Sequence, residues 1–296
     1  MSTDAAPAHD RAALSAAFER AIATALREDL GSTGAEADIT TVSTVRADTS
    51  GEGTVIAKQH GVVAGLEALS ATFEQLDDRV EVELLEQDGN KVQPSATLAI
   101  VRGPARAILT GERTALNLLG HLSGIATLAH KFVEKAPAAR IVETRKTLPG
   151  LRALEKYAVT CGGASNHRFS LWDGVLIKDN HIVAAGGVGE AVRRARKATT
   201  LPVQVECATR DDVLEAIGAG APSLLLDNAT PDELRELVGL IRERAPGTLI
   251  EASGGITLDN VDAIADTGVD RISIGALTHS APGLDVSLNL DRVWSE

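Results

Sequence analysis

The stretch Val203-Gln-Val-Glu-Cys-Ala-Thr-Arg-Asp-Asp-Val-Leu-Glu-Ala-Ile-Gly-Ala-Gly-Ala-Pro-Ser-Leu-Leu-Leu-Asp227 holds one complete unit of the pattern that decides the fold. A short run rich in β-branched residues opens it, and residues 210–218 after Thr209 are typical of a helix with its N-cap. The closing run at 223–227 is apolar almost throughout, as a strand buried on both faces should be. The stretch therefore predicts strand, helix and strand in succession.

The same alternation extends in both directions from this stretch, between about residue 138 and residue 275. Strands are predicted at 140–144, 174–178, 203–207, 223–227, 248–252 and 271–275. Helices are predicted at 150–161, 187–198, 210–218, 231–245 and 258–267, with Thr209, Thr230 and Thr257 as N-caps. Six such alternations predict a parallel sheet, either open or closed into a barrel. Polar residues end nearly every strand, which favours an incomplete β/α barrel because barrels place their active sites at that face.

The first part of the chain has a different pattern. Residues 11–30 are expected to form a helix that Gly31 ends, and 106–135 a mainly helical segment with a break near 120–124. Strands at 53–57, 80–84 and 97–101, with a helix at 65–76 between them, indicate a mixed α+β domain. Residues 284–293 alternate loosely and are expected to return to that domain as a strand.

We therefore predict an α/β protein with two domains. Residues 1–125, joined by the C-terminal segment 282–296, form an N-terminal α+β sandwich. Residues 126–281 form an incomplete β/α barrel of six to seven strands that carries the catalytic site.

Composition excludes several classes of protein. Apolar residues make up 44% of the 296 residues and charged residues 24%, which is ordinary for a soluble globular chain. We find no apolar stretch long enough for a membrane span and no secretory signal in residues 1–11. Cys161 and Cys207 are expected to be free thiols in a reducing cytoplasm. The net charge of −12 argues against nucleic-acid or anionic-membrane binding.

Positive charge is concentrated in one segment of this acidic chain. Residues 140–181 contain seven Lys or Arg against four Asp or Glu, a local net charge of +3. Three motifs carry it: Thr144-Arg-Lys-Thr147, Asn166-His-Arg168 and Leu176-Ile-Lys-Asp-Asn-His181. Arg can grip a carboxylate or phosphate with two hydrogen bonds, and Lys adds a compact charge. A solvated basic face or surface loops after strands remain open as alternatives on these residues alone.

Other strand ends supply complementary groups. Glu206 and Asp227 end successive strands, where paired carboxylates could hold Mg²⁺, orient ribose hydroxyls or serve as structural ion-pair partners. Ser253-Gly-Gly255 and Gly275-Ala-Leu-Thr-His279 follow the last two strands, where backbone N–H groups can bind phosphate, although such glycine turns can also be free of ligand. Together the motifs predict a polyanionic ligand with at least one phosphate.

These motifs resemble those of the quinolinate phosphoribosyltransferase family over roughly residues 20–290. The resemblance rests on Gly111-Glu-Arg-Thr-Ala-Leu-Asn-Leu118, His121-Leu-Ser-Gly-Ile-Ala126, Thr144-Arg-Lys-Thr-Leu-Pro-Gly-Leu-Arg152, Glu155-Lys-Tyr-Ala-Val159, Asn166-His-Arg168, Leu176-Ile-Lys-Asp-Asn-His181, Leu226-Asp-Asn228, Ser253-Gly-Gly255 and Gly275-Ala-Leu-Thr-His279. It implies a homodimer that joins quinolinate to phosphoribosyl pyrophosphate with Mg²⁺, giving nicotinate mononucleotide, pyrophosphate and carbon dioxide for NAD synthesis.

Roles for individual residues follow from this resemblance. It implies catalytic roles for Lys146, Glu206 and Asp227, with the two acids also handling Mg²⁺. Arg113 is expected to reach the neighbouring subunit's site. The residues implied in substrate binding are Arg113, Thr144, Arg145, His167, Arg168, Lys178, Ser253, Gly254, Gly255, Gly275, Ala276, Leu277, Thr278 and His279.

Some positions depart from the family pattern. Gln204 stands where a first glutamate is common, Cys207-Ala208 where Val-Asp is frequent, and Phe169-Ser170 where Leu-Gly is usual. A divergent paralogue of the molybdenum-transport type, a sugar-phosphate isomerase and a non-catalytic binding protein are the alternatives. The intact set of cations in the central motifs argues against the first two, and the paired carboxylates argue weakly against the third.

Overall fold

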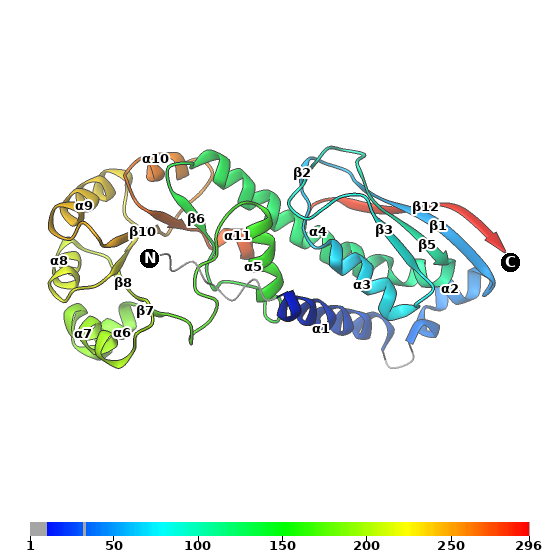
Figure 1. Ribbon diagram of the computed structural model, residues 1–296, viewed down its shortest axis with the longest axis horizontal. Coiled ribbons are helices and arrows are strands. Elements are labelled where there is room, and N and C mark those ends of the chain that lie inside the picture. Colours follow the sequence, from blue (N-terminus) through cyan, green and yellow to red (C-terminus); the bar gives the residue numbers. More distant parts are fainter. Residues whose placement is uncertain (1–10, 32–33, 296) are drawn as a thin grey trace. The chain divides into compact units, whose positions relative to one another are not determined.

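The computed structural model describes residues 11–31 and 34–295 (Figure 1). The prediction that residues 1–11 contain no secretory signal falls almost entirely on residues 1–10, which lie outside the described residues. The described chain divides into two compact units. The barrel unit contains residues 131–146 and 164–276. The sandwich unit contains the described residues up to His130, together with 147–163 and 277–295.

The barrel unit is built on a six-stranded sheet whose neighbouring strands all pair in parallel. Its order is β6-β11-β10-β9-β8-β7, so β6 and β7 are the two edges and the barrel is incomplete, as predicted. The strands are β6 (Arg140–Val142), β7 (Val175–Ile177), β8 (Val203–Cys207), β9 (Ser223–Asp227), β10 (Leu249–Ser253) and β11 (Arg271–Ser273). All six predicted strands are confirmed, with ends within two residues.

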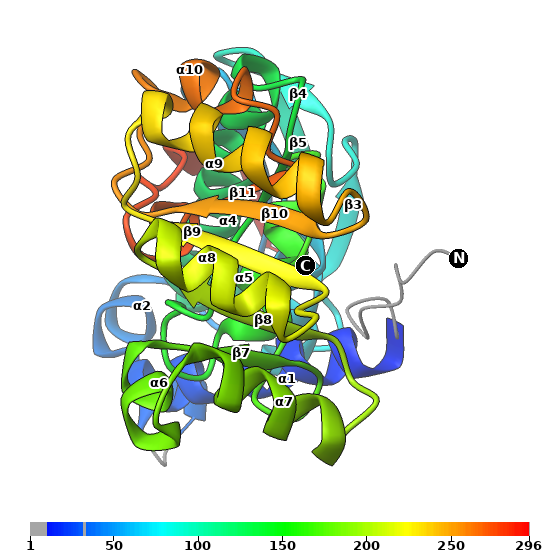
Figure 2. The same ribbon diagram turned by 90° about the vertical axis from the view of Figure 1, so that its left-hand side faces the viewer.

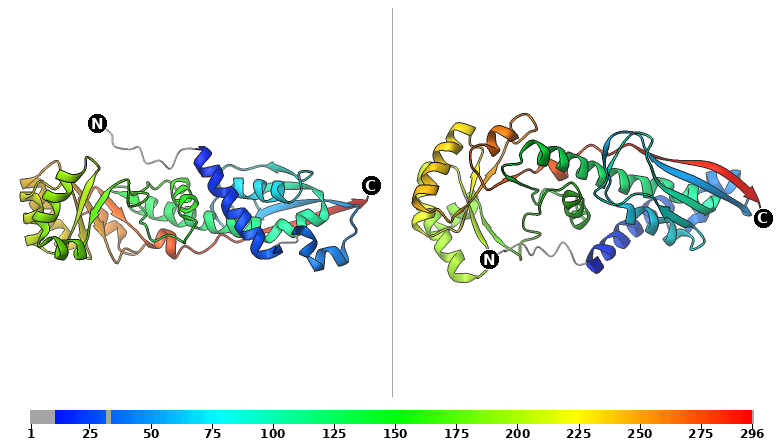
Figure 3. Two further views of the ribbon diagram at one scale, coloured as in Figure 1. Left: turned by 90° about the horizontal axis from the view of Figure 1, so that it is seen from below. Right: turned by 45° about the horizontal axis from the view of Figure 1, so that its top comes forward.

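Helices cover one face of this sheet. They are α6 (Asp179–Ala185), α7 (Val188–Ala198), α8 (Arg210–Gly218), α9 (Pro231–Arg244) and α10 (Val261–Ala265). Figure 2 shows α7, α8 and α9 in front of the strands, and the right view of Figure 3 shows the same helices along the outer side of the sheet. Alternate strand residues such as Leu224, Ile250 and Ile272 are completely buried. Every second side chain of these strands is apolar and buried, and these side chains pack the sheet against the helices.

Helix α6 was not predicted, because its residues had been interpreted only as a strand-end motif. It ends at Gly186, whose φ of 86° lies in the left-handed region, and Gly187 follows with a φ of 137°. Two successive positive φ values turn the chain before α7 begins, so α6 is a separate helix that precedes the one predicted at 187–198.

Two of the three predicted N-caps are confirmed. Thr209 and Thr230 each accept a hydrogen bond from the backbone N–H three residues on, and Asp212 and Glu233 reciprocate to the cap. The prediction for Thr257 is wrong, because α10 begins only at Val261. Residues 257–260 form a turn in which the N–H of Thr257 donates to the Asn260 side chain.

The sandwich unit has an antiparallel sheet of order β12-β1-β5-β3. Its strands are β1 (Thr49–Ala57), β3 (Glu81–Leu84), β5 (Thr97–Pro104) and β12 (Val286–Ser295), with β2 (Gly61–Val62) and β4 (Lys91–Val92) as a separate pair. The predicted return of the C-terminal segment is confirmed, since β12 pairs with β1 over its whole length (Figure 1).

The helical elements of the sandwich unit are α1 (Arg11–Leu30), η2 (Gly34–Ala37), α2 (Ile39–Thr44), α3 (Leu66–Leu76) and α5 (Arg152–Cys161); α4 (Ala105–Lys135) and the short α11 (Ala276–His279) each lie partly in it. A hydrophobic core joins α3 and α4 to the sheet. Its fully buried members include Val55, Leu69, Phe73, Leu98, Val101, Ile108 and Leu119. Few aromatic rings are available, so aliphatic side chains supply most of this core.

The predicted break of the long helix near residues 120–124 is wrong. Helix α4 runs without interruption from Ala105 to Lys135. A β-carbon on Gly124 would lie 2.2 Å from the carbonyl oxygen of Pro282, and one on Gly120 would lie 2.9 Å from that of Leu284. The N–H of Leu284 also donates to the Gly120 carbonyl at 2.8 Å. These glycines let the 282–284 segment approach the helix closely instead of ending it.

Among the described residues, no helix combines the length and apolarity needed to cross a membrane.

The glycine packing gives a first prediction. Gly124→Ala should lower the free energy of unfolding by about 1–3 kcal/mol, because the added methyl overpacks the contact with Pro282 and Gly283. The measurement is urea denaturation. Gly239→Ala, in the exposed part of α9 with nothing near its β-carbon, is the matched control and should stabilise by about 0.5–1 kcal/mol. Equal stability of the two variants would contradict the proposed packing role.

Candidate functional site

The carboxyl ends of the parallel strands bring several predicted residues to one edge of the barrel unit. Lys178 directly follows β7, while Glu206, Asp227 and Ser253 lie at or next to the ends of β8, β9 and β10. Asp227 and Ser253 are paired in register. Parallel pairing makes these side chains neighbours although about twenty or more residues separate them in the sequence.

Two arginines of the site have like charges and are partly removed from water. Burial lowers the pKa of Arg168, and the charge of Arg145 lowers it further, which shows that the two guanidinium groups repel each other. The buried Nε of Arg145 has no hydrogen-bond partner among the described residues. An unpaired, desolvated donor beside a second cation is costly unless an anion binds there. The pair is therefore a candidate site for an anionic group.

The Arg168 side chain is held in place by its own loop. Its Nη1 donates to the carbonyl oxygen of Gly174 at 2.9 Å. The Asp173 carboxylate accepts from the backbone N–H groups of Phe169 and Ser170 at 2.5 and 2.7 Å, which closes the loop into a tight turn. The guanidinium is thus positioned before any ligand arrives.

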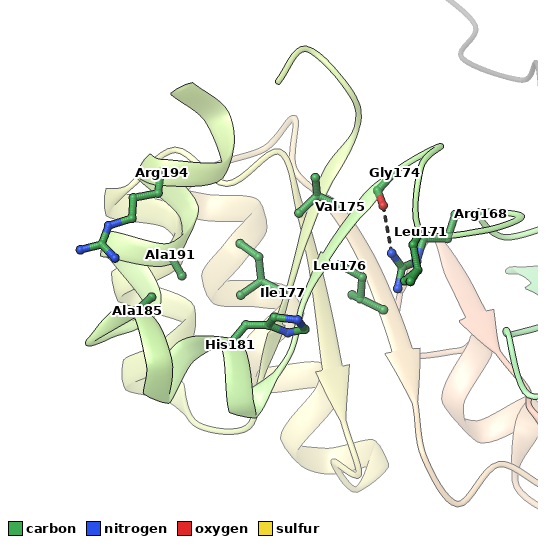
Figure 4. Close-up of a pocket in the computed structure, with 10 residues that line it drawn as sticks. All are labelled: Arg168, Leu171, Gly174, Val175, Leu176, Ile177, His181, Ala185, Ala191 and Arg194. Carbon is green, nitrogen blue, oxygen red and sulfur yellow. Dashed lines mark hydrogen bonds between the residues drawn. The ribbon is translucent and has the colours of Figure 1, made fainter. Parts of the chain in front are cut away.

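A cavity of about 350 Å³ lies against the edge strand β7 and includes Arg168 in its wall. Figure 4 shows the hydrogen bond to Gly174, with Arg168 near Leu176 on one side of the strand and Ala191 of α7 on the other. His181 of α6 also lines it, and its Nδ1 accepts the N–H of Lys178 at 3.0 Å. The α6 helix therefore fixes the strand-end backbone that carries Lys178.

Glu206 and Asp227 both lie near cationic or amide partners. The Glu206 carboxylate is 3.5 Å from Nζ of Lys178, and Asp227 accepts from the Asn228 side chain at 2.6 Å. Asp227 also lines a second cavity, of about 280 Å³, between β8, β9 and their following helices.

Whether this arrangement suits Mg²⁺ depends on how the ion is held. Within the described residues, no group of three or more His, Cys, Asp or Glu side chains could hold a metal. Mg²⁺ commonly binds through one or two carboxylates, with water and substrate phosphates completing its shell. Glu206 and Asp227 thus fit an ion shared with a phosphorylated substrate, whereas they do not form a complete protein cage.

The loop after β10, in which a phosphate site was predicted, turns through two glycines with positive φ. Gly254 and Gly255 have φ values of 87° and 62°. A β-carbon on Gly254 would lie 2.2 Å from Asn228 Oδ1, so the loops after β9 and β10 interlock there, and the Asn228 N–H donates to the Ser253 carbonyl at 2.8 Å. A β-carbon on Gly255 would meet nothing within 4 Å, which leaves open space beside its backbone.

The remaining predicted residues are distributed between the two units. Thr144 is half-buried and accepts the N–H of Lys146, whose side chain is exposed. Gly275 follows β11 and Ala276 begins α11, in which Leu277 and Thr278 are buried while the exposed His279 contacts Ser280 at 2.6 Å. Arg113 belongs to the sandwich unit, on α4, and its exposed guanidinium is 3.9 Å from Glu112.

His167 lies in a polar network that sequence reasoning did not identify. Its Nε2 is 3.2 Å from Gln204 Oε1, and Gln204 Nε2 donates to Glu251 Oε2 at 3.0 Å. Arg271 Nε donates to the same Glu251 oxygen at 2.5 Å. Glu251 was not predicted as a candidate although apolar and polar residues alternate from Ile250 to Ser253. That period of two was the available signal.

Comparison with known proteins agrees with this architecture. Two family models match: "Quinolinate phosphoribosyl transferase, N-terminal domain" over residues 38–123 and "C-terminal domain" over 125–289. A human nicotinate-nucleotide pyrophosphorylase [carboxylating] is 48% identical over 79% of this chain and 80% of its own length. A probable enzyme of that name from Bacillus subtilis is 43% identical over 89% and 90%.

A solved structure gives the same result for the fold. The nicotinate-nucleotide pyrophosphorylase from Francisella tularensis superposes with a TM-score of 0.87 at 35% identity, covering 94% of this chain and 97% of that one.

The paired arginines give a second prediction. A dicarboxylate such as phthalate, at about ten times its dissociation constant, should stabilise the protein by about 1.4 kcal/mol through binding to the folded state. Arg145→Gln should abolish this stabilisation and, without ligand, should be at least as stable as wild type because it relieves repulsion with Arg168. Thermal denaturation measures both effects. Arg235→Gln, in an exposed pair with Asp232, is the control that should respond like wild type. Full stabilisation of Arg145→Gln would refute the receptor role.

Proposed function

The chain belongs to the quinolinate phosphoribosyltransferase family, and we infer from this membership that it is a carboxylating nicotinate-nucleotide pyrophosphorylase of NAD biosynthesis. It transfers the phosphoribosyl group of phosphoribosyl pyrophosphate to quinolinate. The products are nicotinate mononucleotide, pyrophosphate and carbon dioxide. Matches over most of the chain, on both units, support the complete reaction.

The observation that supports quinolinate binding best is the unpartnered Nε of Arg145 beside Arg168. Quinolinate has two adjacent carboxylates, and two preorganised guanidinium groups can each take one with paired hydrogen bonds. Lys178, which directly follows β7, is assigned as a third cation of the proposed site, together with Thr144 and His167. A mononucleotide or a simple sugar phosphate would require fewer cations in this position.

The second substrate is proposed to lie along the later strand ends. Ser253, Gly254 and Gly255 offer backbone N–H groups and open space to its 5′-phosphate, with the segment Gly275–His279 completing the phosphate site. Glu206 and Asp227 face the ribose from β8 and β9. Lys146 is assigned to the pyrophosphate group. Its exposed ammonium group, on a flexible stem, can pair with the negative charge of that group.

The chemistry then needs electrostatics and positioning more than proton transfer. The ring nitrogen of quinolinate forms a bond to the anomeric carbon while the bond from that carbon to pyrophosphate breaks. Positive charge develops on the ribosyl ring, and the carboxylates of Glu206 and Asp227 stabilise it. The bond between the ring and the adjacent carboxylate breaks next, its electron pair passes to the cationic ring, carbon dioxide leaves, and a proton from solvent replaces it.

Mg²⁺ is proposed as the cofactor. Glu206 and Asp227 would hold it together with substrate oxygens and water, and it would supply charge neutralisation for the departing pyrophosphate. The Lys178 amine near Glu206 would share that carboxylate when quinolinate is absent.

We also propose a cytoplasmic homodimer. Both cysteines are free, which fits a reducing compartment. Arg113 is exposed on α4 and is assigned to the site of the neighbouring subunit.

The substrate assignment predicts turnover of quinolinate, and not of nicotinate, with phosphoribosyl pyrophosphate and Mg²⁺. Release of carbon dioxide and formation of the mononucleotide should be equal in amount, and excess EDTA should abolish both. Chromatography and trapping of labelled carbon dioxide make the measurement. Turnover of nicotinate without quinolinate turnover would overturn the assignment.

The shared site predicts complementation between subunits. Arg113→Ala and Lys146→Ala proteins should each be inactive, and after subunit exchange the mixture should recover about a quarter of wild-type activity. Half of randomly formed dimers are mixed, and each mixed dimer has one intact site of two. Mass spectrometry of differently labelled subunits should verify the exchange. Proven exchange without recovered activity would contradict a contribution of Arg113 across the dimer.

A further inference from the structure

A fully buried carboxylate lies inside the barrel unit without a role in the reaction as described so far. Glu251 is in the middle of β10 and has no exposed surface. Its Oε2 accepts from Arg271 and from Gln204, and its Oε1 lies 3.4 Å from Nε2 of His167. Gln204 is on β8 and Glu251 on β10, so their contact spans the intervening β9 on the side opposite the apolar, helix-covered face.

The hydrogen bonds around His167 determine the position of its ring proton. The backbone N–H of Arg168 donates to Nδ1 of His167 at 2.7 Å, so Nδ1 is an acceptor. The proton is then on Nε2, which donates to Gln204 Oε1. The Gln204 side chain accepts from His167 through Oε1 and donates through Nε2 to Oε2 of Glu251. The donors and acceptors thus form one consistent chain from Arg168 to Glu251.

The charges in this chain also balance. Burial raises the pKa of Glu251, but the hydrogen bond from His167, the charge of Arg271 and the hydrogen bond from Gln204 together lower it below its usual value. Glu251 is therefore ionised, and Arg271 neutralises it at 2.5 Å. Gln204 is neutral and adds no charge to this network. A buried ion pair of this kind is retained more readily for specificity than for stability.

On the basis of the proposed function, we propose that Glu251 is a positioning residue for quinolinate: with Gln204 it orients the His167 ring, and His167 in turn holds the backbone of Arg168. The segment is anchored at both ends, since the His167 N–H donates to the buried Glu143 at 3.1 Å and the Arg168 guanidinium donates to Gly174. Glu251 therefore acts on the carboxylate-binding arginine through two intermediates and does not touch substrate.

Three variants test the chain step by step. Gln204→Met cuts the link to His167 and leaves the Glu251–Arg271 pair intact, so the fold should be preserved. Glu251→Gln removes the charge. The double variant Gln204→Glu with Glu251→Gln exchanges carboxylate and amide and restores both the charge and the hydrogen-bonded pair.

Steady-state kinetics distinguish a positioning role from a general structural one. Gln204→Met and Glu251→Gln should each raise KM for quinolinate about tenfold, equivalent to about 1.4 kcal/mol of binding, and should leave KM for phosphoribosyl pyrophosphate within about twofold. The exchange variant should recover a quinolinate KM within about threefold of wild type. The control is Asp270→Asn, whose carboxylate pairs with Arg242 at the amino ends of the strands; it should lower the thermal midpoint without separating the two KM values.

A folded Gln204→Met protein with unchanged KM for quinolinate would overturn the inference, as would an equal rise in both KM values. Failure of the wild type to convert quinolinate would instead refute the proposed function. Nitrogen NMR of the imidazole rings gives a readout independent of activity. The His167 signal, assigned by its loss in His167→Gln, should show a protonated Nε2 and an unprotonated Nδ1, and this pattern should change in Gln204→Met. A protonated Nδ1 in the wild type would also overturn it.

Discussion

Parallel pairing of six short strands is the constraint from which the site follows. Each strand of the barrel unit is only three to five residues long. All six run in the same direction, so their carboxyl ends lie together at one end of the sheet. Side chains separated by loops and whole helices become neighbours there without any local sequence signal that links them. The helices on the other face supply the apolar contacts that hold the strands in register.

The polar side of this sheet carries more charge than a typical protein interior. Glu251 is completely buried, and Arg145 and Arg168 repel each other in a partly desolvated place. The two sets of charges are compensated in different ways. Glu251 is neutralised by Arg271, whereas the arginine pair is proposed to be neutralised by an anionic ligand. The protein as a whole is acidic, so this local excess of positive charge is the basis of the selectivity for anions that is proposed for the site.

Sequence reasoning predicted the strands of the barrel unit well because strongly apolar runs alternated with helices and turn residues. It was wrong where a residue type is compatible with more than one local structure. Gly120 and Gly124 were expected to break α4, but they make room for the backbone of 282–284. Thr257 was expected to cap a helix and instead begins a turn. For the two glycines a partner distant in sequence decided the outcome, and no local propensity encodes such a partner, whereas for Thr257 the nearby Asn260 side chain took the N–H.

The sequence by itself determined the fold class, the family and the cationic motifs around residues 144–178, since these depend on residue type, order and short-range periodicity. Only the tertiary structure decided that Arg145 Nε, near Arg168, has no hydrogen-bond partner in the part of the chain that is described, and that Gln204 connects His167 to Glu251. Hydrogen-bond satisfaction and burial depend on distances between strands that the chain brings together only on folding. The period of two in its strand could have placed Glu251 on the polar face, but its hydrogen-bond partners are decided by packing alone.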